Sequence, residues 1–120
     1  MIYGIGNDIL EIARMEKSIE SERFMAFSFS EAERTLFSGK PAKLAGCFAA
    51  KEALSKALGT GVRGFSLDEI SVLRDELGKP YFVFTGSIKK IIETKYLTAH
   101  VALTNSKEYA VANVVLEERL

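Results

Sequence analysis

Three ionisable side chains and a glycine-rich turn stand close together in the middle of the sequence. Lys51, Glu52 and Lys56 belong to the segment AAKEALSKALGTG, in which residues 59–61 are Gly-Thr-Gly. On a helix at ~100° per residue, these three side chains and Ser55 fall into one sector of about 140°. A glycine-rich turn lets a phosphate approach the backbone and its N–H donors. A carboxylate, a lysine and such a turn suit a metal-bound pyrophosphate.

The same spacing also has a simpler interpretation. Glu52 and Lys56 are four residues apart, in the order that favours an ion pair on a helix surface. Such a pair contributes ~0.3–0.5 kcal/mol and needs no ligand. Both interpretations stay open at this level.

A further carboxylate, Asp8, follows the first predicted strand, residues 2–7. Strand alternation puts Gly4, Gly6 and Asp8 on one face. Glycines there let another backbone or a ligand approach closely, which makes Asp8 a candidate site residue. However, Asp8 and Glu11 also have capping-box spacing, so Asp8 alternatively caps a helix that begins near Ile9.

A long central helix must hold Glu52 and Lys56. Pro41 suits the first turn and Gly59 suits the end, so the helix is predicted over residues 42–58. Apolar side chains cover most of its circumference, which predicts that it is buried. They are Cys47, Ala49, Ala50, Ala53, Leu54, Ala57 and Leu58.

The other patterns predict an α+β fold with a largely antiparallel sheet at one side. A charged helix or turn is expected at 16–24, and Ser30 and Glu33 have capping-box spacing at the start of a further helix. A hairpin is predicted from residues 70–74 and 81–84, a helix from 86 to about 96, and strands at 99–104 and 109–116. No linker separates these elements, so residues 1–120 are expected to form a single domain.

Composition excludes several classes of function. Sixteen basic and sixteen acidic residues give zero net charge, so no overall field attracts nucleic acid or a membrane. No apolar run approaches the ~20 residues that span a bilayer, and the first residues do not resemble a secretory signal. We therefore expect a cytoplasmic location. The single cysteine, Cys47, is interpreted as a small buried hydrophobe.

Several segments together resemble the bacterial holo-acyl-carrier-protein synthases. They are GIGNDILEI, FAAKEALSKALGTG, LGKPY and LTNSKEYAVANVVLE, and the resemblance spans nearly the whole chain. The most specific part is a GIGxDI start combined with a K-E-A-x-x-K helix and GTG behind it. The resemblance implies the 4'-phosphopantetheinyl transferase fold, built as a compact homotrimer with active sites at subunit interfaces.

The resemblance also implies an activity. It is the Mg²⁺-dependent transfer of the 4'-phosphopantetheine of coenzyme A to a serine of apo acyl carrier protein, in fatty acid biosynthesis. Asp8 and Glu52 match the metal ligands, and Lys56 matches the lysine beside the pyrophosphate; these three form the expected catalytic set. The serine proton would pass to a water, held by the metal or by one of the two acids. The coenzyme A contacts implied are Lys51, Lys56, Gly59, Thr60, Gly61, Asn105 and Ser106.

Two positions depart from the family. Asn105 replaces a frequent histidine near the nucleotide of coenzyme A, and Cys47 replaces a frequent arginine. A non-catalytic paralogue that binds coenzyme A or a carrier protein is therefore the alternative function. The family docks its acidic carrier on the early helical region, where Arg14 is the expected contact. The lone histidine, His100, is expected to be structural.

Overall fold

The central helix predicted from the sequence is the axis around which the chain folds. In the computed structural model, which describes residues 1–119, α4 spans Pro41–Leu58. Pro41 lies in the first turn, where its missing N–H loses no helical hydrogen bond. Gly59 ends the helix with φ 83°, a left-handed conformation that favours glycine. The predicted helix is confirmed.

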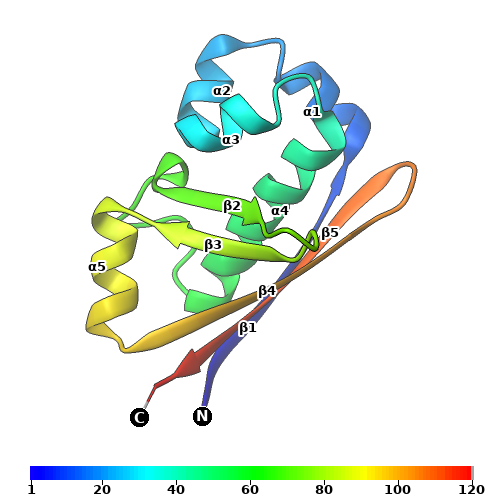
Figure 1. The fold of residues 1–120 in the computed structure, drawn as a ribbon. Helices are drawn as coiled ribbons and strands as arrows, with labels where there is room; N and C mark the ends of the chain where they lie inside the picture. The colour runs from blue at the N-terminus through cyan, green and yellow to red at the C-terminus, as the bar shows by residue number, and fades with distance from the viewer. Residues whose placement is uncertain (120) are drawn as a thin grey trace.

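The main sheet lies against one side of α4 (Figure 1). Among the described residues it consists of β1 (Ile2–Glu11), β5 (Tyr109–Glu118) and β4 (Leu97–Asn105), antiparallel and in that order. The pairing of β4 with β5 was predicted. The α+β class with a largely antiparallel sheet is therefore confirmed.

β1 extends further than the sequence predicts. Asp8 pairs with Ala112 and Glu11 pairs with Tyr109, so the backbone ladder continues where a helix was expected near Ile9. α1 begins only after Glu11, its N-cap residue, and makes no side-chain cap bond. The interpretation of Asp8 as a helix cap is therefore wrong, because strand pairing with β5 determines the conformation of this segment.

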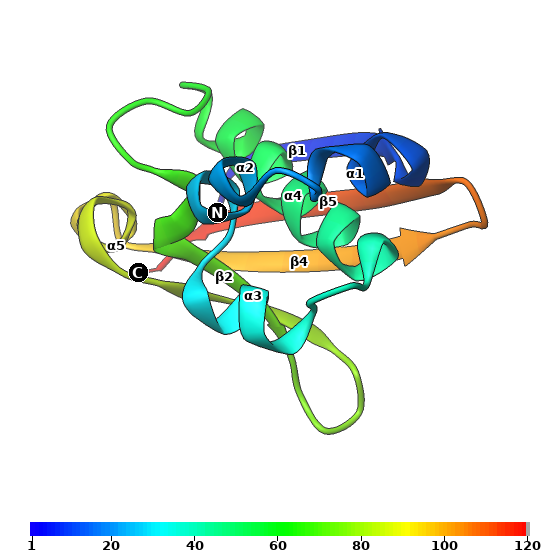
Figure 2. The same cartoon turned by 90° about the horizontal axis from the view of Figure 1, so that it is seen from above.

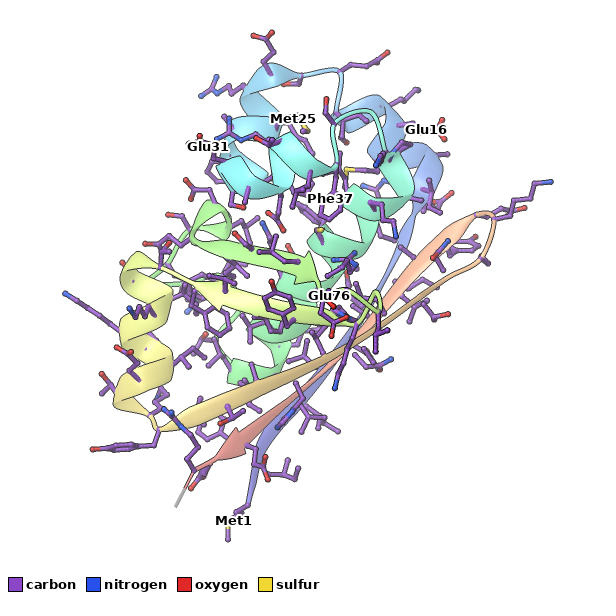
Figure 3. All side chains as sticks on the ribbon, in the orientation of Figure 1. Met1, Glu16, Met25, Glu31, Phe37 and Glu76 are labelled. Atoms are coloured by element: carbon purple, nitrogen blue, oxygen red, sulfur yellow. The ribbon has the colours of Figure 1, made fainter. Side chains whose placement is uncertain are left out.

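Short helices cover the end at which α4 begins (Figure 1). They are α1 (Ile12–Ser18), α2 (Glu22–Ser28) and α3 (Glu31–Leu36), here called the helical cap. The capping box predicted for α3 is confirmed, since the Ser30 hydroxyl accepts from the Glu33 N–H at 3.2 Å and the Glu33 carboxylate accepts from the Ser30 N–H at 2.9 Å. Glu16 and Glu31 extend outward from the helical cap, and both side chains are exposed (Figure 3).

A β-hairpin packs against α4 and β4. It pairs β2 (Ile70–Arg74) with β3 (Pro80–Phe84) around the predicted turn, where Gly78 has φ 86°. The short 3₁₀ helix η1 (Leu67–Glu69) precedes it and α5 (Gly86–Thr94) follows it, ending before the predicted boundary near residue 96. Figure 2 shows the hairpin turn projecting beyond α3. No helix formed by residues 1–119 is both long and apolar enough to cross a membrane.

α4 packs directly on β1 because small residues line both surfaces. A Cβ at Gly4 would overlap the carbonyl oxygen of Ala57, and a Cβ at Gly6 would overlap that of Ala53. Four helical residues rise ~6 Å and two strand residues ~6.7 Å, so successive glycines meet successive helical turns. The close approach predicted at these glycines is therefore made by another backbone.

The face of the main sheet that points away from α4 carries exposed apolar side chains. Ile5 is 71% exposed and Ile9 is 62% exposed, and their partners on β5 are Val115 and Val111. Exposed apolar area of this kind often marks an interaction surface. The outer sheet face, as we call it, consists of Ile5, Asn7, Ile9, Val111, Asn113, Val115, His100, Ala102 and Thr104.

Candidate active site

Asp8 and Lys56 meet across the contact between β1 and α4. The Asp8 side chain is only 21% exposed, and it lies on the strand face that carries Gly6. The Lys56 ammonium donates to Asp8 Oδ1 at 3.2 Å and to the Asn7 carbonyl at 2.9 Å. The sequence predicted Asp8 and Lys56 at one site, and the structure brings them together.

Glu52 lies one helical turn before Lys56 and is half-buried. Burial raises the pKa of Glu52, the negative charge of Asp8 raises it further, and the positive charge of Lys56 opposes both effects. The two carboxylates are thus close enough to interact when both are ionised. In the described part of the chain the ion pair of Lys56 is with Asp8. The interpretation of Glu52 and Lys56 as an isolated surface pair is therefore wrong.

Hollows of ≈ 360 Å³ and ≈ 260 Å³ open on the outer sheet face, between β1 and β5, and both reach Lys56. Asn7, Lys56 and Asn113 line both of them, and Asp8 lines the smaller one. A ligand in the smaller hollow would contact an ammonium and a carboxylate directly. We call Asp8, Glu52 and Lys56 the carboxylate cluster.

The carboxylate cluster suits a divalent cation that prefers oxygen ligands. Mg²⁺ in proteins is commonly held by one or two carboxylates, with water and substrate phosphate oxygens as the other ligands. Asp8 and Glu52 supply two carboxylates whose mutual repulsion a cation would relieve. Within residues 1–119 no group of three or more His, Cys, Asp or Glu could hold a metal. A cation bound here must therefore complete its shell with water and substrate.

The glycine-rich turn leaves α4 three residues after Lys56. Gly59 and Gly61 have φ 83° and 67°, and the Thr60 hydroxyl donates to the Gly61 carbonyl at 2.9 Å. Both glycines and Thr60 are exposed. The backbone N–H groups of such a turn are well suited to bind an anion.

Lys51 does not belong to the carboxylate cluster, although the sequence pattern grouped it there. Its ammonium is fully buried and donates to the Ser28 carbonyl at 2.8 Å, Glu33 Oε1 at 2.6 Å and the Leu67 carbonyl at 3.0 Å. All three of its N–H donors are used inside the fold. The predicted contact of Lys51 with coenzyme A is therefore corrected, because a helical sector of about 140° is too wide to face a single cleft.

Asn105 and Ser106 lie at the opposite edge of the main sheet. Asn105 ends β4, whereas Asp8 lies on β1, and β5 separates the two strands. Neighbouring strands are ~4.8 Å apart, so the two edges are ~10 Å apart. Within one chain, the structure therefore does not bring Asn105 and Ser106 to the carboxylate cluster.

A hollow of ≈ 300 Å³ opens beside Asn105, and we call it the β4-edge hollow. Lys43 from the first turn of α4 and Arg74 from the end of β2 both line it. The Arg74 guanidinium lies over the Phe37 ring at 5.3 Å and donates to the Val72 carbonyl at 2.9 Å; Phe37 is labelled in Figure 3. Neither cation was predicted from the sequence as a site residue. Only the position of the hairpin against β4 shows that they share a hollow.

Three other residues singled out in the sequence lie outside the carboxylate cluster. Arg14 is exposed on α1. Cys47 is buried, as predicted, and burial raises its pKa to about 12, so its thiol stays protonated at neutral pH. His100 lies on the outer sheet face with Nε2 3.0 Å from Glu117 Oε1.

Known proteins resemble the chain over almost its whole length. The sequence model of the 4'-phosphopantetheinyl transferase superfamily matches residues 4–114. A holo-[acyl-carrier-protein] synthase of Clostridium beijerinckii is 46% identical over 98% of each chain. Among solved structures, holo-(acyl-carrier-protein) synthase from Bacillus anthracis in complex with CoA (3',5'-ADP) has a TM-score of 0.84 at 39% identity, covering 99% of each chain. Holo-[acyl-carrier-protein] synthase from Neisseria meningitidis has a TM-score of 0.90 at 35% identity, covering 98% of this chain and 100% of the other. The resemblance inferred from the sequence is confirmed, and the chain belongs to the 4'-phosphopantetheinyl transferase superfamily.

Proposed function

We propose that this protein transfers the 4'-phosphopantetheine of coenzyme A to a serine of an apo acyl carrier protein, in fatty acid biosynthesis. The serine oxygen forms a bond to the phosphorus that carries the pantetheine, and the P–O bond to the other phosphate breaks. The products are the holo carrier and adenosine 3',5'-bisphosphate. The observation that carries the proposal is the meeting of Asp8, Glu52 and Lys56 across the contact between β1 and α4.

Asp8 and Glu52 are the residues we assign to hold Mg²⁺. When bound, the ion neutralises charge on the pyrophosphate of coenzyme A and stabilises the leaving nucleotide. The half-buried position of Glu52 and its repulsion by Asp8 both favour occupation by a cation. The smaller hollow, which Asp8 and Lys56 line, gives the substrate phosphates room to contribute the remaining ligands.

The chain's other groups bind and orient the substrates. The Lys56 ammonium stabilises negative charge that grows on the pyrophosphate during transfer. The N–H groups of the turn formed by Gly59, Thr60 and Gly61 hold phosphate oxygens. The nucleophile belongs to the carrier, and its proton leaves to water at the carboxylates of Asp8 and Glu52.

The β4-edge hollow is proposed to receive the nucleotide end of coenzyme A, with contacts to Asn105 and Ser106. Asn105 and Cys47 lack the positive charge that relatives frequently have at these positions. Lys43 and Arg74 line the hollow and supply cations that can bind phosphate. These cations suit the binding of coenzyme A by a transferase or by a non-catalytic paralogue, and it is the carboxylate cluster that favours the transferase.

A homotrimer would bring the two halves of this site together. The carboxylate cluster and the β4-edge hollow lie at opposite edges of the main sheet, so a second copy of the chain can place its hollow beside the first copy's carboxylates. The outer sheet face, where Ile5 and Ile9 are largely exposed, offers apolar surface for that association. We further propose that residues 1–120 act as one domain in the cytoplasm, with neither nucleic acid nor membrane as a partner.

Arg14 is the residue we assign to the acidic carrier protein. It is exposed on α1, and opposite charge on the partner speeds encounter, an effect that salt weakens. The test of the function is mass spectrometry of an apo carrier incubated with the protein, coenzyme A and Mg²⁺. We expect the carrier to gain one phosphopantetheinyl group. No gain should occur when EDTA is present from the start. Binding of the carrier without any gain in mass would contradict transfer and favour the non-catalytic alternative.

A further inference from the structure

A buried ion pair joins α4 to the helical cap. Lys51 Nζ lies 2.6 Å from Glu33 Oε1, and both side chains are 0% exposed. The same ammonium donates to the carbonyls of Ser28 and Leu67. Lys51 therefore has a complete set of acceptors without any ligand.

Glu33 completes the network from the other side. Its carboxylate accepts from the Ser30 N–H and from the Val72 N–H, each at 2.9 Å. Through these bonds, Lys51 of α4 is tied to the end of α2, the start of α3, η1 and β2. We call this network the Lys51–Glu33 clamp.

A contribution to folding stability does not by itself explain why a buried ion pair occupies this position. Burial lowers the pKa of Lys51, and the charge of Glu33 and its hydrogen bond oppose that shift. The cost of removing both charges from water offsets most of their attraction, and apolar side chains of similar volume are often at least as stabilising. A buried pair is better suited to selecting one arrangement of the surrounding elements.

α4 needs such a selection because the surface that it turns to β1 is smooth, although Leu44, Leu54 and Leu58 are also buried on this helix. It lies on Gly4 and Gly6 through Ala53 and Ala57, and small side chains do not interlock as ridges and grooves do. A rotation of the helix by ~20° would move an atom ~6 Å from its axis by ~2 Å. Functional constellations tolerate only ~0.5 Å. The small residues on the buried surface of α4 are Ala45, Gly46, Cys47, Ala49, Ala50, Ala53, Ser55 and Ala57.

We propose that the Lys51–Glu33 clamp is a positioning pair that sets the rotation of α4 and so keeps Glu52 and Lys56 directed at Asp8. Glu52 follows Lys51 in α4. Because the geometry of the helix relates consecutive residues, the direction in which Lys51 leaves α4 also sets the direction in which Glu52 leaves it. This inference rests on the proposed function, because the consequence to be measured is the binding of Mg²⁺ by Asp8 and Glu52.

The test replaces Lys51 in the full chain. Lys51→Met keeps most of the side-chain volume and removes the charge and its three hydrogen bonds. Mg²⁺ is titrated by calorimetry into protein saturated with coenzyme A, at a temperature well below the melting points of all variants. We expect the Kd for Mg²⁺ to rise about 10- to 100-fold, as when residues that orient metal ligands are lost. The Michaelis constant for the carrier should stay unchanged, because its assigned contact, Arg14, lies on α1, and no hydrogen bond of the clamp involves α1.

Glu33→Gln is the second variant, and it keeps the side-chain shape and an oxygen acceptor for the Val72 or Ser30 N–H. It should weaken Mg²⁺ binding in the same direction even where Lys51→Met folds poorly. Leu44→Ala is the matched control, because Leu44 is a fully buried apolar residue of the same helix. Its truncation should lower the melting temperature and leave the Kd for Mg²⁺ at the wild-type value.

Wild-type Mg²⁺ affinity in both clamp variants would overturn the proposal and leave the pair a structural one. Equal weakening by Leu44→Ala would also overturn it, because general loosening of the core would then suffice. Wild-type protein that takes up no Mg²⁺ when it is saturated with coenzyme A would contradict the proposed function itself. That outcome is recognised before any variant is made.

Discussion

At the scale of single residues, the proposed chemistry depends on two carboxylates that share one small region. Lys56 neutralises Asp8 through a bond of 3.2 Å, whereas Glu52 is half-buried and repelled by Asp8. The sequence motifs predicted Asp8, Glu52 and Lys56 as one group. They failed for Lys51, because a helical projection does not show which sector faces the helical cap and which faces β1. They missed Arg74, which reaches its hollow only through the placement of the hairpin.

The raised pKa of Glu52 leads to a prediction about stability without metal. A carboxyl whose pKa is higher in the folded state stabilises the fold at low pH, and this contribution is lost as the pH rises through the folded pKa. At pH 7, metal-free Glu52→Gln should therefore melt at a higher temperature than the wild type. The difference should shrink as the pH falls toward 4.5, the ordinary pKa of a glutamate side chain. Thermal denaturation followed by circular dichroism measures both effects.

The same variant should lose at least ~100-fold of its transfer activity, because an amide is a poor Mg²⁺ ligand. Glu93→Gln, an exposed position on α5, is the control and should change neither melting temperature nor transfer. A Glu52→Gln variant with lower metal-free stability at pH 7 would contradict the repulsion between Glu52 and Asp8.

At the scale of elements, the fold depends on how closely α4 approaches β1. Local signals were sufficient for α4, for the capping box of α3 and for the hairpin, since proline, glycine and serine positions determine these ends. They were not sufficient for the end of β1, because Asp8 and Glu11 have the spacing of a cap and only pairing with β5 makes them a strand. Close packing of α4 on β1 is what carries Lys56 to Asp8.

Gly6→Ala should separate the two elements. The added methyl group would overlap the Ala53 carbonyl, and overpacking of this kind costs ~1–3 kcal/mol in free energy of unfolding. Transfer activity and Mg²⁺ affinity should fall as well, because α4 carries Glu52 and Lys56 away from Asp8. Denaturant unfolding, together with Mg²⁺ titration, measures both quantities.

Gly46→Ala is the matched control for Gly6→Ala. Its Cβ would lie 3.6 Å from Leu103 Cδ1 and 3.7 Å from Arg74 Nη2, which are ordinary contacts. Alanine also favours the interior of a helix over glycine by up to ~1 kcal/mol. Gly46→Ala should therefore leave stability unchanged or raise it. Equal stability of the Gly6 and Gly46 variants would contradict the packing described for β1.

At the scale of the whole molecule, one chain holds two separate halves of the proposed site. The carboxylate cluster and the β4-edge hollow lie at opposite edges of the main sheet, and the outer sheet face between them carries exposed Ile5 and Ile9. The resemblance to known synthases suggested this arrangement, since strand patterns alone do not reveal which sheet face meets a second chain. Assembly is therefore expected to be a condition for activity.

Ile5→Glu should disrupt that assembly. A charge on the outer sheet face would be costly to bury between copies, so the trimer should dissociate and transfer should fall with it. Light scattering measures the mass, and the carrier assay measures transfer. Leu77→Glu, at a 96% exposed position of the hairpin turn, is the control and should remain trimeric and active. An active Ile5→Glu monomer would contradict a shared site.

Two inactive variants should complement each other when mixed. Asp8→Ala removes a residue of the carboxylate cluster, and Arg74→Ala removes a cation of the β4-edge hollow. If each site takes one half from each of two neighbouring chains, random mixed trimers should recover about one quarter of the wild-type transfer activity. Recovery requires unfolding and refolding the two chains together. No recovery in correctly assembled mixed trimers would place both halves of the site within one chain.

The most direct measurement of the central claim is a crystal structure of the protein with coenzyme A and Mg²⁺. We predict one ion with an oxygen of Asp8 and an oxygen of Glu52 each at ~2.1 Å, together with pyrophosphate oxygens of coenzyme A. An ion that binds the pyrophosphate without either carboxylate, or Asp8 and Glu52 directed at different groups, would contradict it.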